Sequence, residues 1–264
     1  MTPFYFGTGQ HRLYAVYDPA AADAGVTPRA VVLCYPWGPE YVYAHRALRH
    51  LATRLSLAGF HTLRFDYFGT GDSAGEITDA DLGGWQNDIE AAIEELIDST
   101  GVKQVALVGL RLGATLAASV AMRRHDQISS LVLWDPVVSG VPYLEELADM
   151  SRRKTGKTQA IGQTGLGGDH EILGFSLTEK MAEEIKKVDL VAMLSALPTD
   201  TMILISHQMP WHDKLQRAVR EQQENLPLIQ YADDAPAWIA SSNNAGIVPV
   251  DTLNIVTNWL EQCN

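Results

Sequence analysis

The chain has 264 residues, of which 46% are hydrophobic, 20% charged and 8% aromatic, and its mean hydropathy is −0.06. This composition is that of an ordinary globular protein and excludes a disordered chain, a collagen-like repeat and a coiled coil. The formal net charge of −12 opposes nucleic-acid phosphates and anionic lipids, so we expect neither a nucleic-acid nor a membrane partner.

Short apolar runs alternate with helical segments along the first part of the chain. Residues 29–34 form a continuous apolar run, which is typical of a strand covered on both faces. Residues 43–58 carry apolar side chains on one helical face, and Gly59 ends this predicted helix. Residues 60–65 are predicted to form the next strand. A second amphipathic helix is indicated by apolar residues spaced three or four apart: Trp85, Ile89, Ile93 and Leu96.

The same alternation continues to the end of the chain. A strand at 104–108 leads through Gly109 and Gly113 into a helix of small residues at 114–122. Because strands and helices alternate, we predict an α/β fold with a mostly parallel sheet and helices on both faces. Ligands of such sheets bind beyond the carboxyl ends of the strands. Further strands are expected at 128–134, 202–206 and 228–231, and a last helix from Pro249.

The alternation is interrupted between residues 141 and 198. We predict that 141–198 forms a helical lid over the strand ends. This lid is inserted into an α/β core made of 1–140 and 199–264. The insertion contains a basic segment (151–158), a glycine-rich segment (162–168) and a predicted helix (178–188).

The two cysteines, Cys34 and Cys263, lie near opposite ends of the chain and form no CxxC pair or ligand cluster. This usage favours a reduced, cytoplasmic protein without disulfides. Residues 1–13 lack the pattern of a signal peptide, and Arg111 interrupts the long apolar stretch at 105–122, so we expect a soluble protein. The histidines show no metal-ligand spacing, and we expect neither a metal nor a cofactor.

The most informative segment is Gly109-Leu-Arg-Leu-Gly113. A strand that turns at once into a helix, with a glycine two residues on either side of the tip, is the pattern of a nucleophile elbow. The tip of such an elbow carries serine, whereas this chain has Arg111. A guanidinium stays protonated in proteins and is not an acyl acceptor, so the sequence predicts the elbow without its nucleophile.

Three segments resemble the α/β-hydrolase superfamily, and the resemblance covers nearly the whole chain. Residues 66–73 (DYFGTGDS) are similar to the D-x-x-G-x-G-x-S segment of serine-aminopeptidase-like hydrolases. Residues 109–114 and 131–140 resemble the exosortase-A-system-associated hydrolases. The resemblance implies an α/β-hydrolase fold.

In that superfamily a serine at the elbow, an acid after a late strand and a histidine after the last strand form a catalytic triad. Here Arg111 replaces the serine. The last histidine in the chain is His212, and none follows Tyr231. Because two of the three members are missing, we do not expect ordinary serine hydrolysis.

Three charged residues follow strands that the fold should place side by side: Arg111, Asp135 and His207. We expect Arg111 to pair with Asp135 at this edge, with His207 nearby as a titratable group. In one interpretation the three are catalytic. Arg111 then points into an open hollow and binds a carboxylate, an enolate or a phosphate, while Asp135 or His207 moves a proton. In the other interpretation the ion pair only fixes the rim of a vestigial pocket.

Five further residues are expected to bind the substrate. The resemblance implies an oxyanion hole formed by the backbone N–H of Leu112 and that of Tyr35 or Trp37. Two more aromatic residues, Phe68 and Trp238, are expected to line an aromatic pocket together with Tyr35 and Trp37.

Three functions fit these features. We favour an atypical α/β-hydrolase-fold enzyme that carries out isomerisation, epimerisation, cyclisation or lyase-type proton transfer in a biosynthetic pathway. Its substrate would be a small molecule or peptide that contains a carboxylate or an acyl group. The second function is non-catalytic binding of a ligand or protein, and the third is weak ester or thioester hydrolysis by a water activated at His207 or Asp135. A homodimer is left open.

Overall fold

The computed structural model describes residues 1–21, 28–155, 170–222, 227–240 and 246–263. Parts of two segments discussed above therefore lie outside the described residues. These are the end of the basic segment (156–158) and the whole glycine-rich segment (162–168).

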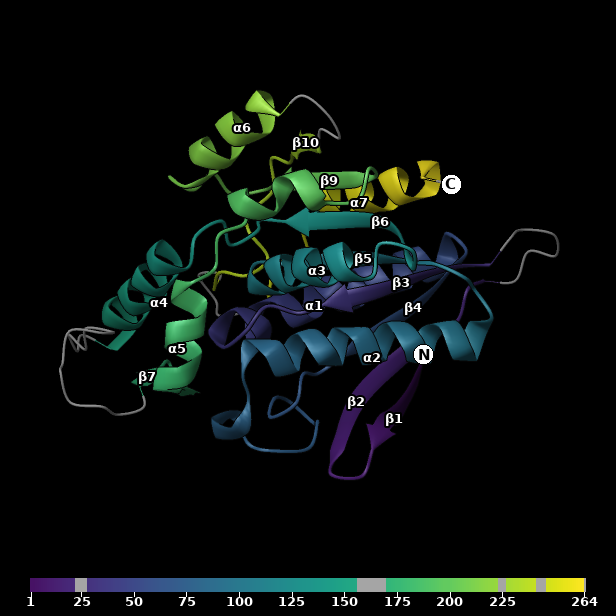
Figure 1. The fold of residues 1–264 in the computed structure, drawn as a ribbon, viewed down its shortest axis with the longest axis horizontal. Helices are drawn as coiled ribbons and strands as arrows, with labels where there is room; N and C mark the ends of the chain where they lie inside the picture. The colour runs from purple at the N-terminus through teal and green to yellow at the C-terminus, as the bar shows by residue number, and fades with distance from the viewer. Residues whose placement is uncertain (22–27, 156–169, 223–226, 241–245, 264) are drawn as a thin grey trace.

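One eight-stranded sheet forms the centre of the molecule (Figure 1). The first two strands form an antiparallel hairpin that joins the sheet antiparallel to β4, and all other neighbours are parallel. The strand order is β1 (Thr2–Thr8), β2 (His11–Asp18), β4 (Phe60–Phe65), β3 (Arg29–Cys34), β5 (Val105–Leu110), β6 (Ile128–Trp134), β9 (Thr201–Ile205) and β10 (Leu228–Tyr231).

The predicted mostly parallel sheet is confirmed, but the sequence analysis did not identify the β1–β2 hairpin. The reason is that β1 is largely exposed, with Phe6 its one buried residue, so it shows no continuous apolar run. The expected neighbours β5, β6 and β9 do lie side by side.

Helices cover both faces of the sheet. From β3 the chain moves outward to β4 and then back across β3 to β5 and β6. Because crossovers between parallel strands are right-handed, this change places α1 (Pro39–Leu57) on one face of the sheet and α2 (Leu82–Thr100) and α3 (Leu112–Arg123) on the other. The C-terminal helix α7 (Val250–Gln262) packs beside α1. Helix α1 begins four residues before the predicted start, since Pro39 occupies its first turn.

The chain between β6 and β9 forms its own helices and a small hairpin beyond the carboxyl ends of the strands (Figure 1). Helix α6, which follows β9, was not identified from the sequence. The division into a core and a lid at 141–198 stays a prediction. The elements between β6 and β9 are α4 (Gly140–Thr155), β7 (His170–Ile172), β8 (Phe175–Leu177), α5 (Glu179–Lys186) and the 3₁₀ helix η2 (Val191–Ala196). Helix α6 spans His212–Glu221, and a further 3₁₀ helix, η1 (Ile77–Asp79), precedes α2.

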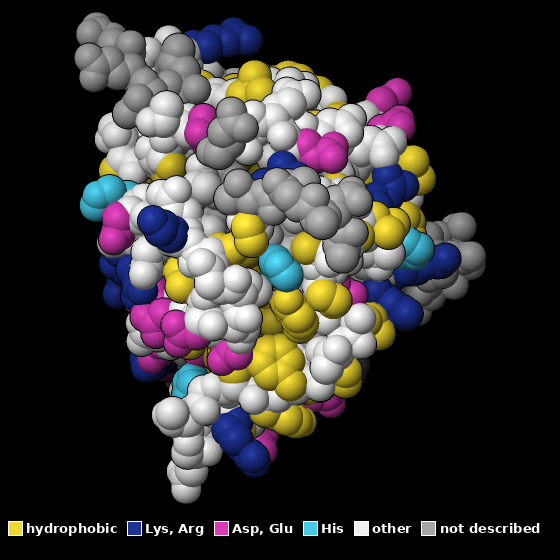
Figure 2. Space-filling view, turned by 90° about the vertical axis from the view of Figure 1, so that its right-hand side faces the viewer, with side chains coloured by type: hydrophobic (Ala, Val, Ile, Leu, Met, Phe, Trp, Pro, Cys, Tyr) yellow, Lys and Arg dark blue, Asp and Glu magenta, His cyan; other side chains and the backbone are white. Residues whose placement is uncertain are grey.

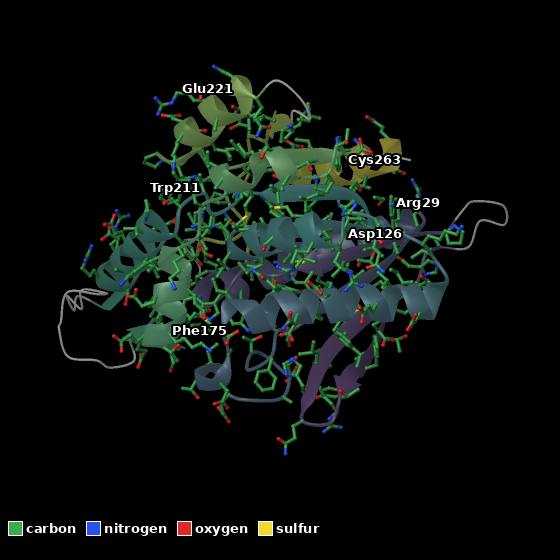
Figure 3. The ribbon with its side chains drawn as sticks, in the orientation of Figure 1. Arg29, Asp126, Phe175, Trp211, Glu221 and Cys263 are labelled. Carbon is green, nitrogen blue, oxygen red and sulfur yellow. The ribbon has the colours of Figure 1, made fainter. Side chains whose placement is uncertain are left out.

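The two ends of the sheet can be located by labelled residues. Figure 3 places Phe175 and Trp211 at the end covered by α4 and α5, and Arg29 and Asp126 at the opposite end. On that opposite end, basic, acidic and hydrophobic side chains are interspersed (Figure 2). Among the described residues, no helix is both long enough and apolar enough to cross a bilayer.

The core is mostly apolar, and Arg111 is the largest charged side chain among the fully buried ones of the described residues. Arg111 ranks among the largest fully buried side chains, together with Trp85, Trp134 and Trp238. A guanidinium in such a place needs compensating partners, because burying an unpaired charge is very unfavourable. The partners of Arg111 therefore define the site.

Candidate functional site

Arg111 forms the tip of a sharp turn between β5 and α3. Its backbone has φ 56° and ψ −121°, a strained conformation for a residue with a side chain. A Cβ at Gly109 would lie 2.4 Å from the Cα of Ala114, and one at Gly113 would lie 2.2 Å from the carbonyl oxygen of Tyr35. Only glycine fits at both positions, so the predicted elbow is confirmed as a backbone geometry.

The guanidinium of Arg111 is held by two carboxylates from different elements. Its Nε donates to Glu40 Oε1 on α1 at 2.8 Å, and its Nη2 forms an ion pair with Glu146 on α4. The Tyr143 hydroxyl, also on α4, donates to the second oxygen of Glu40 at 2.9 Å. The elbow, α1 and α4 thus meet in one buried polar cluster.

Two expectations about Arg111 are therefore wrong. Its exposed fraction is 0%, so it does not point into an open hollow. It also pairs with Glu40 and Glu146 rather than with Asp135. The physical reason is that α1 begins, and α4 passes, directly beside the elbow, and both bring a carboxylate closer than the strand-end aspartate.

Aromatic rings complete the enclosure of the guanidinium. The Cζ atom of Arg111 lies 3.8 Å from the ring centroid of Trp238, 5.3 Å from that of Tyr143 and 5.9 Å from that of Trp211. Such contacts stabilise a cation through the negative faces of the rings. This enclosure keeps Arg111 in place without access to water.

Burial shifts the pKa values of this cluster. It raises the pKa of Glu40 to about 7, and the negative charge of Glu146 adds to the rise while Arg111 opposes it. Burial alone lowers the pKa of Arg111, but Glu40 and Glu146 outweigh it and leave that pKa raised. Arg111 therefore remains a cation at every physiological pH.

Asp135 has its own set of donors at the end of β6. Its carboxylate accepts hydrogen bonds from the backbone N–H and the hydroxyl of Ser206 (2.7 and 2.5 Å) and from the backbone N–H of His207 (3.2 Å). A fourth comes from Trp238 Nε1 at 2.9 Å. Trp238 thus bridges Asp135 and Arg111, as the histidine of a triad bridges acid and nucleophile.

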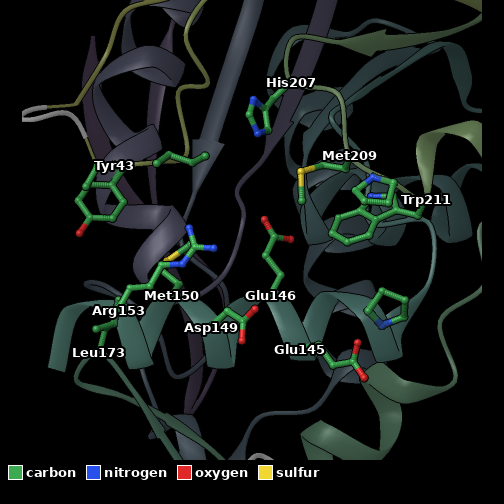
Figure 4. A pocket seen from close by; sticks show the side chains of 14 residues that line it. Tyr43, Glu145, Glu146, Asp149, Met150, Arg153, Leu173, His207, Met209 and Trp211 are labelled. Carbon is green, nitrogen blue, oxygen red and sulfur yellow. The ribbon is translucent and has the colours of Figure 1, made fainter. Parts of the chain in front are cut away.

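A cavity of about 750 Å³ opens beside this cluster, between α4 and the loops that follow β9 and β10 (Figure 4). Glu146 and His207 point into the same space from opposite sides. The cavity is lined by apolar and aromatic groups with a few charged ones: Tyr43, Pro142, Glu145, Glu146, Asp149, Met150, Arg153, Leu173, His207, Met209, Pro210, Trp211, Ile239 and Ala240.

Of the predicted substrate-binding residues, none contributes to the wall of this cavity. Tyr35 lines a smaller cavity of about 200 Å³, where Arg64 donates to its hydroxyl at 3.5 Å. Phe68 stacks on His11 with ring centroids 4.3 Å apart. Trp37, Leu112 and Trp238 are buried in the core.

The sequence analysis missed Glu40, Tyr143 and Glu146. One signal was available, because a charge at a buried elbow requires carboxylates close by. The pattern could not say which ones, since Glu40 and Glu146 lie 71 and 35 residues from Arg111. Within the described residues, no group of three His, Cys, Asp or Glu side chains is arranged to hold a metal ion.

The sheet order, the elbow and the helices on both faces define an α/β-hydrolase fold. The profile of the family described as "Serine aminopeptidase, S33" matches residues 29–240, and the chain belongs to this family.

Known proteins support this assignment at low identity. The mitochondrial palmitoyl-protein thioesterase ABHD10 of rat is 24% identical over 168 residues, which are 61% of this chain and 54% of the relative. The match to the human form of the same protein covers 23% of that relative, so the chain spans only about a quarter to a half of the length of the curated relatives it matches. The structure of Est1E from Butyrivibrio proteoclasticus with bound ferulic acid has a TM-score of 0.69 at 16% identity, covering 98% of this chain and 96% of that one. Mouse alpha/beta hydrolase domain-containing protein 10 has a TM-score of 0.57 at 12% identity, covering 99% and 98%. These structural likenesses show the fold.

Proposed function

We propose that this protein binds a small acyl- or aryl-containing molecule in the cavity beside α4 and forms no acyl-enzyme at position 111. One observation carries the proposal. The nucleophile position holds a fully buried guanidinium, whereas the adjoining cavity of about 750 Å³ remains open. That volume lies within the range of small-molecule sites, and its mixture of apolar walls and few polar groups is typical of them.

The favoured non-hydrolytic reaction loses its main support. It required Arg111 to bind the substrate anion from an open hollow, but the guanidinium is buried and its Nε and Nη2 are paired with Glu40 and Glu146. Asp135 is also saturated by four donors, so it does not offer a free base. Binding in the cavity requires no proton transfer by either group.

The test combines chemical labelling with ligand binding. We expect no labelling of the protein by a fluorophosphonate probe and no turnover of p-nitrophenyl esters or acyl thioesters above the buffer rate. We expect ferulic acid, the ligand named for the similar Est1E structure, or a medium-chain acyl ligand to raise the melting temperature. Labelling would overturn the proposal, and so would the absence of any binding across both ligand classes.

A second candidate is slow hydrolysis by a water that His207 activates. It is favoured by the family membership and by the thioesterase relatives, and the ring of His207 does line the cavity. Turnover of an acyl thioester that disappears in His207→Ala, but persists in the control His50→Ala on the exposed side of α1, would establish it instead.

A further inference from the structure

The polar cluster around Arg111 contains donors that have no acceptor. Arg111 Nη1 is buried and has no hydrogen-bond partner among the described residues, although Nε and Nη2 of the same group are occupied. Trp211 Nε1 is a second buried donor without a partner in the described part of the chain. Trp211 also lines the cavity, and its ring centroid lies 5.9 Å from the guanidinium carbon. Two buried donors without acceptors, on neighbouring side chains, favour a ligand rich in acceptors.

Glu146 belongs both to this cluster and to the cavity wall. Its side chain is 16% exposed, whereas those of Arg111 and Glu40 are 0% exposed. Glu40 is also fixed by the Tyr143 hydroxyl. Of the two carboxylates on Arg111, Glu146 is therefore the one that a molecule in the cavity can reach.

We propose that Arg111 is a masked carboxylate subsite of the cavity: the carboxylate of a ligand displaces that of Glu146 from Nη2 and also accepts from Nη1. The proposal rests on the proposed function, because it names the class of ligand, an aryl or acyl carboxylate, that the same cavity binds. The exchange leaves two carboxylates on the guanidinium, that of Glu40 and that of the ligand, while Glu146 turns toward the cavity. It also satisfies a donor that is otherwise unpaired.

The charge of the cavity wall permits this exchange. Glu145 and Asp149 lie on the same wall as Glu146, but Asp149 forms an ion pair with Arg152, and Arg153 lines the cavity as well. Two arginines of the same helix thus partly offset the three acidic groups of the wall. A carboxylate that enters therefore meets less repulsion than the acidic residues alone would cause.

The experiment compares ferulate with its primary amide, which has nearly the same shape and no charge. Binding of both is measured by isothermal titration calorimetry at pH 8 to wild type, Glu146→Gln and Glu145→Gln. Both variants remove one negative charge from the same wall, but only Glu146→Gln removes the competitor of the ligand on Arg111.

We expect Glu146→Gln to bind ferulate about tenfold more tightly than Glu145→Gln does, with the affinity for the amide the same in both. An equal gain in affinity for ferulate in the two variants would overturn the subsite, since the gain would then come only from the loss of one negative charge on the cavity wall. Equal affinity for acid and amide in all three proteins would also overturn it while leaving the proposed function standing. If neither compound nor a medium-chain acid and its amide bind to any of the proteins, the proposed function fails as well.

Discussion

Glu40 and His212 are both buried near the elbow, and folding moves their pKa values in opposite directions. Burial raises the pKa of Glu40 to about 7 and lowers that of His212 to about 4. Between pH 4.5 and 7 the folded state holds a proton on Glu40 that the unfolded state releases, so Glu40 makes the protein less stable as the pH rises. Between pH 6.5 and 4 the unfolded state protonates His212 while the folded state does not, so His212 makes the protein less stable as the pH falls.

The contribution of Glu40 can be isolated with Glu40→Gln, which keeps the shape of the side chain but does not titrate. We expect the free energy of unfolding of wild type to fall relative to that of the variant by about 3 kcal/mol between pH 5 and pH 8. Urea denaturation at several pH values within this window measures the free energy of unfolding of wild type and of the variant. The exposed control Glu145→Gln should run parallel to wild type, and a parallel curve for Glu40→Gln would contradict the shifted pKa.

Among the elements, α4 connects the site to α5. Its residues Tyr143 and Glu146 bond to the Glu40–Arg111 pair, and its first residue, Gly140, packs directly on α5. A Cβ at Gly140 would lie 1.6 Å from the carbonyl oxygen of Ile185, which is far inside contact distance. The Gly140 N–H also donates to the carbonyl of Val188 at 3.0 Å. Backbone contacts of Gly140 with Ile185 and Val188 thus fix the angle at which α4 leaves the sheet.

We therefore expect Gly140→Ala to push α4 away from α5 and to destabilise the protein by about 2 kcal/mol or more, as overpacking does. Hydrogen exchange should become faster in both helices. The control Gly83→Ala lies in α2, where the nearest atom to a new Cβ is Asp81 Oδ1 at 3.5 Å, an ordinary contact. This control should be neutral or stabilising because alanine favours helices. Equal effects of the two substitutions would show that the close approach at Gly140 is not restrictive.

The elements differ in how well they could be predicted. Strands such as β3 and β5 are buried on both faces, so their apolar runs mark them without knowledge of their neighbours. The elbow could be predicted because a side chain at position 109 or 113 would clash with nearby backbone atoms, so both positions require glycine. The β1–β2 hairpin could not, because β1 is largely exposed and shows no apolar run. The partners of Arg111 could not, because they lie 71 and 35 residues away in the sequence. Arg111 itself shows the limit: its charge predicted a pairing, but only the packing of α1 and α4 decides with what.

At the scale of the whole molecule, three side chains lie in the order of a catalytic triad, although two of them are not residues that a triad uses. Asp135 occupies the place of the acid, Trp238 that of the base, and Arg111 that of the nucleophile. The sheet and the elbow place their backbones, and these do not depend on the three side chains. The scaffold thus places Arg111 and Trp238 where a serine hydrolase carries its nucleophile and its base.

The triple variant Arg111→Ser, Trp238→His, Glu40→Gln tests this directly. The new histidine would lie between Asp135 and the new serine, and Glu40→Gln removes a buried carboxylate that would lack its cation. The matched control carries Trp238→His and Glu40→Gln but retains Arg111, so it has no nucleophile. We expect the triple variant to react with a fluorophosphonate probe and to hydrolyse p-nitrophenyl butyrate at least about tenfold faster than the control, since nucleophile and base act as a unit. A triple variant that folds, as judged by its circular dichroism and melting curve, yet neither labels nor hydrolyses would show that the elbow no longer supports acyl transfer.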